Sequence, residues 1–127
     1  MNKFGFYNDK HQLNYRECLK KCFSTDNDVE LKIGTVLYLI ALAATIDDES
    51  LISSAFDYEN MKIKMECLNN YKKASAVADT IMLAYNLMTN CDTYGDFQLP
   101  NISVLIASHP DIAPALIEAI KRRYCIE

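Results

Sequence analysis

The sequence has no tryptophan, and it contains only three glycines and three prolines among 127 residues. Sandwiches and barrels need frequent turns, and collagen needs glycine at every third position, so this composition argues against all three. Gly5, Gly34 and Gly95 lie too far apart to form a loop that cradles a phosphate group. The shortage of turn residues therefore favours a helical protein.

A long apolar run is missing as well. The longest nearly apolar stretch is residues 36–46, which is 11 residues, whereas a membrane-spanning helix needs about 20. The start of the chain, MNKFGF, contains no apolar core of signal-peptide length. The five cysteines are an odd number and are most simply explained as reduced thiols. We therefore expect a cytoplasmic protein with no membrane partner, folded as a single helical domain over residues 1–127.

Positive charge is not in excess, because the formal net charge is -4. Non-specific binding of phosphate backbones depends on clusters of Lys and Arg, so this balance argues against a general polyanion binder. Half of the residues are hydrophobic, which excludes a disordered tail.

Hydrophobic periodicity predicts an all-α fold of five or six consecutive helices. Their expected ranges are about 9–23, 29–45, 47–56, 71–89, 101–108 and 112 to the end of the chain. The segments 29–45 and 71–89 are apolar around most of their circumference, so we expect them to form the buried central pair.

The segment 57–70 has the least regular pattern. Met61, Ile63 and Met65 alternate with charged residues, which is the period of a strand. A single strand has nothing to pair with, so we expect a packed loop with at most one short extended piece near 61–66.

Three groups of residues carry a resemblance to a known family. They are Phe6-Tyr7-Asn8 with His11, Tyr15 and Cys18, then Leu83-Ala84-Tyr85-Asn86-Leu87, and finally Ala119-Ile120-Lys121 with Arg123 and Tyr124. In order and spacing the chain resembles a family of small uncharacterised proteins from Gram-positive bacteria and their mobile elements. The resemblance implies a helical domain with no assigned activity and supplies no catalytic residue.

A possible metal site lies on the first helix, where His11, Tyr15, Cys18 and Cys22 share one face. A thiolate pair with a histidine could begin a zinc site, but zinc needs four ligands and the only other histidine is His109. The same face must also be buried, and free cysteine is among the most buried residue types. We therefore expect core packing, with no metal and no cofactor.

Catalytic residues are not predicted. Cys67, Cys91 and His109 lie in expected loops or turns and could meet in space, but no sequence signature supports a nucleophilic site. Asp79 is expected on a narrow solvated stripe of its helix. The protein is therefore not expected to be an enzyme.

Acidic residues are concentrated between positions 24 and 60, where the sequence has eight acidic residues and one basic residue, Lys32. They are Asp26, Asp28, Glu30, Asp47, Asp48, Glu49, Asp57 and Glu59. Helix caps and solvated turns explain most of them singly, but together they could form one acidic face. Such a face can steer association with a basic protein partner. We therefore expect a small interaction protein, for example an inhibitor of a bacterial defence nuclease of the anti-CRISPR kind.

The alternative is a nucleic-acid-binding accessory protein that uses Lys121, Arg122 and Arg123. The last two helices have the length of a helix-turn-helix, which reads bases with the first residues of its second helix. Here those residues are Ile112, Ala113, Pro114 and Ala115, which cannot read a base edge by hydrogen bonding. Nucleic acid is therefore the less favoured partner, and the sequence does not predict the oligomeric state.

Overall fold

The computed structural model describes residues 1–23 and 29–126, and this part of the chain is mostly helical. The helices are α1 (Asp9–Lys21), α2 (Leu31–Ile46), α3 (Leu51–Ser54), the 3-10 helix η1 (Met65–Asn70), α4 (Ala76–Thr89), α5 (Ile102–Ser108) and α6 (Ala113–Tyr124). The predicted helical class is confirmed.

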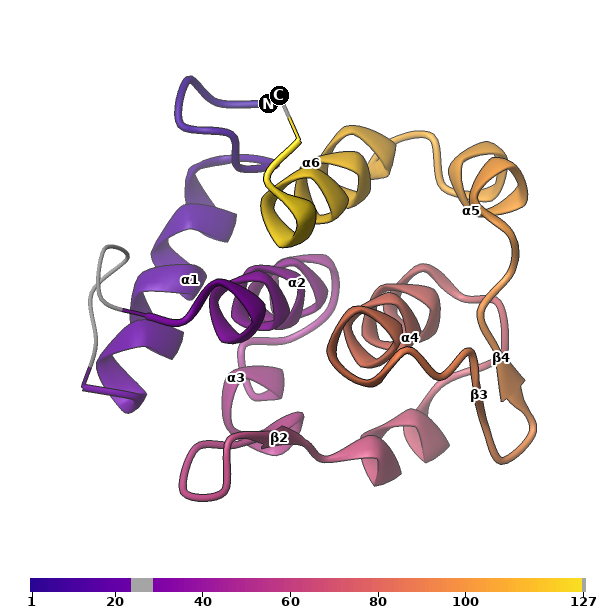
Figure 1. The fold of residues 1–127 in the computed structure, drawn as a ribbon, viewed down its shortest axis with the longest axis horizontal. Coiled ribbons are helices and arrows are strands. Elements are labelled where there is room, and N and C mark those ends of the chain that lie inside the picture. The colour runs from indigo at the N-terminus through magenta and orange to yellow at the C-terminus, as the bar shows by residue number, and fades with distance from the viewer. Residues whose placement is uncertain (24–28, 127) are drawn as a thin grey trace.

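Helix α2 is the centre of the fold, and it packs against α1, α4 and α6 (Figure 1). Every residue from Ile33 to Ala44 is buried. A helix that is apolar on all sides is stable only when other elements surround it, and the three neighbouring helices do so. Helix α4 is the second inner helix, as its pattern predicts, and α1 and α6 lie on the other sides of α2.

Three helices begin with a side-chain cap. The side chains of Asn8, Ser75 and Asn101 accept hydrogen bonds from backbone N–H groups in the first turns of α1, α4 and α5. The cap at Ser75 explains why α4 begins five residues after the predicted start at Tyr71. Ala74, immediately before the cap, has a φ of 63°, which also interrupts any helix arriving from Tyr71.

The segment 57–70 differs from its prediction in two respects. The alternating residues do have a strand partner, because β2 (Lys62–Ile63) pairs antiparallel with β1 (Phe56–Asp57), whose first residue is the predicted end of the third helix. The residues that follow form η1 rather than a loop. A second hairpin, β3 (Thr93–Tyr94) with β4 (Phe97–Gln98), lies in the segment between the predicted helices 71–89 and 101–108.

Within the described residues, no helix combines the length and the hydropathy that crossing a membrane requires. The N-terminal segment and the last turn of α6 lie close together (Figure 1). Arg122 on α6 joins them, because its guanidinium donates a 3.3 Å hydrogen bond to the carbonyl of Phe4.

Candidate binding cleft

A cleft of about 450 Å³ lies at the C-terminal end of α2. Its walls come from the start of α1, the end of α2, the start of α4 and the turn between α5 and α6. The lining residues are Tyr7, Asn8, Thr45, Ile46, Ala76, Ser108, His109, Pro110, Asp111 and Ile112. Residues from four distant parts of the sequence therefore meet at one hollow.

One wall of the cleft contains an imidazole–carboxylate pair. His109 Nε2 lies 2.7 Å from Asp79 Oδ2, and the two side chains are only 10% and 4% exposed. The prediction that Asp79 lies on a solvated stripe is therefore wrong. The carboxylate sits in the first turn of α4, where the positive end of the helix and the hydrogen bond to His109 both stabilise it.

The imidazole of His109 could act as a base only with a suitable nucleophile. Among the described residues, no hydroxyl or thiol is hydrogen-bonded to it, although Ser108 is its neighbour in the chain. Burial raises the pKa of the Cys67 thiol to about 11, so this thiol is a poor nucleophile at neutral pH. The pair joins the turn between α5 and α6 to α4, which is a structural role.

Three of the predicted acidic residues lie beside the cleft, directly after Thr45 and Ile46. Asp47 accepts a 2.6 Å hydrogen bond from the Tyr71 hydroxyl, and Glu49 forms an ion pair with Lys10 at the start of α1. Asp48 is exposed, and hydrogen bonds from the backbone and side chain of Ser50 lower its pKa. All three residues are exposed to solvent.

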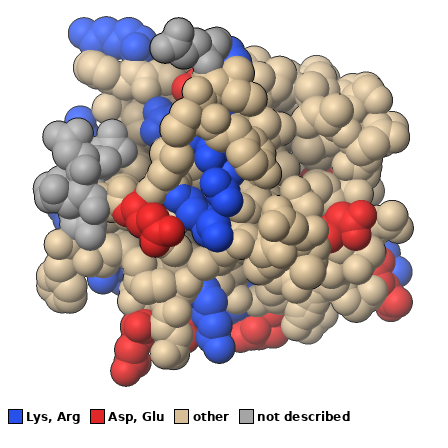
Figure 2. Space-filling model, in the orientation of Figure 1, with Lys and Arg blue, Asp and Glu red and all other residues tan. Residues whose placement is uncertain are grey.

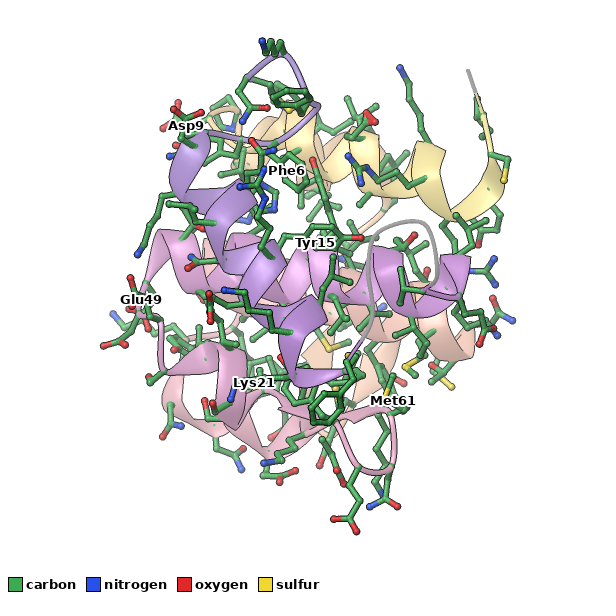
Figure 3. The ribbon with its side chains drawn as sticks, turned by 90° about the vertical axis from the view of Figure 1, so that its left-hand side faces the viewer. Phe6, Asp9, Tyr15, Lys21, Glu49 and Met61 are labelled. Carbon is green, nitrogen blue, oxygen red and sulfur yellow. The ribbon has the colours of Figure 1, made fainter. Side chains whose placement is uncertain are left out.

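The remaining acidic residues lie elsewhere. Asp57 and Glu59 belong to the turn of the β1–β2 hairpin, where Asp57 accepts hydrogen bonds from the N–H groups of Glu59 and Asn60. Figure 3 places Met61 of this turn far from Glu49, which lies on the same edge as Asp9. Glu30 is at the opposite end of α2, about 25 Å from Asp47 at the helical rise per residue. Asp26 and Asp28 lie outside the described residues. Among the predicted acidic residues that the structure describes, only the consecutive residues Asp47, Asp48 and Glu49 lie together at the end of α2; we call these three residues the acidic cluster.

The candidate zinc residues on α1 face the core. His11, Tyr15 and Cys18 are buried, as the core-packing interpretation predicts, and Cys22 is half-buried. His11 Nδ1 accepts a hydrogen bond from the Tyr7 N–H, and its Nε2 donates to the Tyr38 carbonyl. Desolvation lowers the pKa of His11 to about 4. In the described part of the chain, no group of three or more His, Cys, Asp and Glu residues could hold a metal ion.

Two members of the basic triplet are engaged in the fold. The Arg122 guanidinium lies 5.0 Å and 4.5 Å from the ring centres of Phe6 and Tyr38, which is a cation–π arrangement. Arg123 donates a 2.9 Å hydrogen bond to the carbonyl of Leu87 at the end of α4. Lys121 is exposed. These contacts reduce the positive charge that the triplet can offer to a phosphate backbone.

A second hollow, of about 390 Å³, lies between α4, α5 and α6. It is lined mainly by apolar side chains, among them Leu87, Leu105 and Ile120, with Ile102 and Tyr124 about half exposed. None of its lining residues is charged, so the cleft at the end of α2 has the more specific chemistry.

The comparison with protein families gives a match over residues 1–127 to the model of a family of unknown function, DUF6075. The chain belongs to DUF6075. Because the match covers the whole chain, the helices, the cleft and the acidic cluster all fall inside the family region. Neither curated proteins nor solved structures give a match to this DUF6075 chain. The predicted resemblance to an uncharacterised family is therefore confirmed, and it assigns no activity.

Proposed function

We propose that this protein acts by binding another protein that presents a basic surface, and that it performs no catalysis. One observation carries the proposal: a cleft of about 450 Å³ has the acidic cluster at its edge and the exposed carboxylate of Asp111 in its lining. A Lys or Arg side chain of the partner would enter this cleft.

Electrostatics favour such a partner. The C-terminal end of a helix carries a partial negative charge, and the acidic cluster adds three carboxylates to that end of α2. Lys10 offsets only part of this charge through its ion pair with Glu49. A basic side chain would find complementary charge from both the cluster and the helix, which speeds association more than it strengthens the final complex.

A specific instance would be a mobile-element protein of Gram-positive bacteria that inhibits a defence nuclease in the manner of an anti-CRISPR protein. This instance follows by analogy from the small size and acidic character of the chain. Nuclease surfaces that bind nucleic acid are basic, which is the surface chemistry that the cleft would accept.

The nucleic-acid alternative has less support. Arg122 and Arg123 already contact aromatic rings and a backbone carbonyl, so binding through them would require those contacts to change. It remains the competing outcome of the experiment below.

Partner capture from an extract of the native host, followed by mass spectrometry, would identify the partner. Association rates should then be measured over a range of salt concentrations for the wild type and for the triple variant Asp47→Lys, Asp48→Lys, Glu49→Lys. We expect slower association and a flatter salt dependence, because exposed charges act mainly on the encounter rate.

The matched control is the double variant Asp57→Lys, Glu59→Lys, which reverses charges in the β1–β2 turn away from the cleft. It should keep the wild-type salt dependence. Equal association of the wild type and the triple variant would contradict the proposal. Stronger binding of the triple variant to DNA or RNA in a gel shift, lost on neutralising Lys121, would support the alternative instead.

A further inference from the structure

A small pocket of about 80 Å³ lies at the other end of α2, its N-terminal end. It is lined by Tyr15 of α1, Val29, Leu31, Gly34 and Thr35 around the start of α2, and Arg122 of α6. This pocket plays no part in the proposed function, and its chemistry is opposite to that of the cleft.

Two polar atoms of the pocket residues are buried without a hydrogen-bond partner. They are Thr35 Oγ1 and Arg122 Nε, and no other buried side-chain nitrogen or oxygen of the described residues lacks a partner. Thr35 is only 1% exposed. The Glu118 carboxylate lies 3.7 Å from Arg122 Nε, which is too long for a hydrogen bond. Thr35 and Arg122 both line this pocket, which makes its occupant a candidate partner for the two groups.

The start of α2 adds further donors. Its N-cap residue, Glu30, makes no side-chain capping bond, and its first turn contains no acidic residue, unlike that of α1 or α4. The first N–H groups of a helix have no partner within the helix, and together with the helix dipole they favour an anion. Helix α2 has 16 residues, long enough for this effect to be well developed.

Gly34 keeps the backbone of this turn close to its neighbours. A Cβ atom at this position would lie 3.0 Å from Val29 Cγ1 and 3.5 Å from the Tyr15 hydroxyl. A side chain there would narrow the pocket, so glycine leaves its wall open.

Charged side chains of both signs lie near the pocket, because Glu30 is the N-cap residue of α2 and Glu118 lies beside Arg122. Figure 2 shows that Lys and Arg side chains gather over α2 and α6 in the view of Figure 1. Arg122 reaches the pocket itself, and Lys32 lies in the first turn of α2. Glu118 offsets part of the charge of Arg122.

We propose that this pocket binds a small oxyanion, held by Arg122 Nε–H, by the Thr35 hydroxyl and by the N–H groups that begin α2. A carboxylate from a partner's side chain and a free inorganic phosphate share this chemistry. The volume of about 80 Å³ limits the bound group to one of that size.

The test is a titration of ¹⁵N-labelled protein, in separate arms, with inorganic phosphate and with acetate, each compared with chloride at equal ionic strength. Saturable shifts are expected for the amides of residues 31–35 and for the Arg122 Nε–H signal. Saturation with phosphate alone would identify a free phosphate as the ligand, and saturation with acetate would identify a carboxylate.

Two threonine variants make the test specific. Thr35→Val removes the unpartnered hydroxyl and should weaken anion binding at least tenfold. Thr80→Val is the matched control, because the buried Thr80 hydroxyl already donates to the Ala76 carbonyl at 2.7 Å, and it should bind as the wild type does. Arg122→Lys, which keeps the charge but removes Nε–H, should also weaken binding.

Shifts that grow without saturation, or that chloride reproduces, would overturn the proposal and leave water as the occupant. Equal affinity of the wild type and Thr35→Val would overturn it as well.

Discussion

The two ends of α2 differ in the charged side chains around them, and at each end some of these charges have the same sign as that end of the helix dipole. The C-terminal end, which is partially negative, is followed by Asp47, Asp48 and Glu49, whereas the partially positive N-terminal end has Arg122 and Lys32 nearby in addition to its N-cap residue, Glu30.

Helix α1 shows the usual arrangement, with Asp9 in its first turn and Lys20 and Lys21 in its last. The acidic cluster does precede α3, but a helix of four residues has little dipole to benefit from it. Because 12 consecutive residues of α2 are buried, packing rather than end charge stabilises this helix. The charges at its ends are therefore not needed for its stability and are available to bind ligands of opposite charge. Departures from the usual pairing of charged residues with the helix dipole are expected most often at functional sites.

The largest loss of stability is expected from a substitution in the middle of α2, between its two ends. Leu39 is completely buried in the middle of α2, so Leu39→Asp would place an unpaired carboxylate in the core. This costs several kcal/mol against a total stability of about 5–15 kcal/mol, and the domain should unfold. Circular dichroism should show the loss of helix. Leu13→Asp, at a residue that is 53% exposed, is the matched control and should remain folded.

The packing of the middle of α2 can be tested through pH. His11 is neutral in the folded protein, with a pKa of about 4, against 6.5 when unfolded. Between these values the unfolded chain binds more protons, so stability is complete above pH 6.5 and falls as the pH is lowered towards 4. The shift corresponds to about 3 kcal/mol.

Urea unfolding of the wild type and of His11→Gln at pH 4 to 7 would measure this dependence. The variant should be less stable at pH 7 but should lose less stability on acidification. Parallel pH profiles for the two proteins would contradict the assignment.

The Asp79–His109 pair in the wall of the cleft should contribute less to the free energy of unfolding than Leu39 or His11 does. Asp79→Asn, His109→Gln and the double variant form a mutant cycle for the buried pair. A hydrogen bond involving a charged group contributes about 1.5–3 kcal/mol, so a coupling energy of at least about 1 kcal/mol is expected from urea unfolding. Additive single effects would show that the two side chains do not stabilise each other.

Reversing the acidic cluster should have the smallest effect on stability. The triple lysine variant loses the ion pair between Lys10 and Glu49 and the hydrogen bonds that Asp47 and Asp48 accept from Tyr71 and Ser50, all of them exposed, but it gains favourable charge at the end of α2. The free energy of unfolding should change by no more than about 1 kcal/mol, as measured by the urea midpoint. A loss above about 3 kcal/mol would mean that the cluster serves the fold rather than a partner.

Some features of α2 and of its two ends could be predicted from the sequence. The continuous apolar pattern of residues 36–46 predicted the central position of α2, and the apolar circumference of 71–89 predicted its partner α4. The acidic residues after α2 were also predicted as a candidate site. Their division among separate places could not be predicted, because only the folded chain shows that α2 separates Glu30 from Asp47.

Contacts between distant residues escaped prediction for a similar reason. Asp79 and His109 are 30 residues apart, and neither position carries a pattern that links it to the other. Thr35 has an ordinary place in a helix sequence, and only the structure shows that its hydroxyl is buried without a partner beside Arg122. The strand period at 61–66 was visible, but its partner Phe56–Asp57 is too short to produce a pattern of its own.

The most direct test of the comparison is one ¹⁵N-labelled sample titrated separately with inorganic phosphate and with a tetralysine peptide. If the two ends of α2 bind ligands of opposite charge, two separate sets of saturable amide shifts are expected. Phosphate should shift the amide signals of residues 31–35, and tetralysine should shift those of residues 46–49, His109 and Asp111. Shifts of the same amides with both ligands, or shifts that saturate with neither, would contradict the binding of oppositely charged ligands at the two ends of α2.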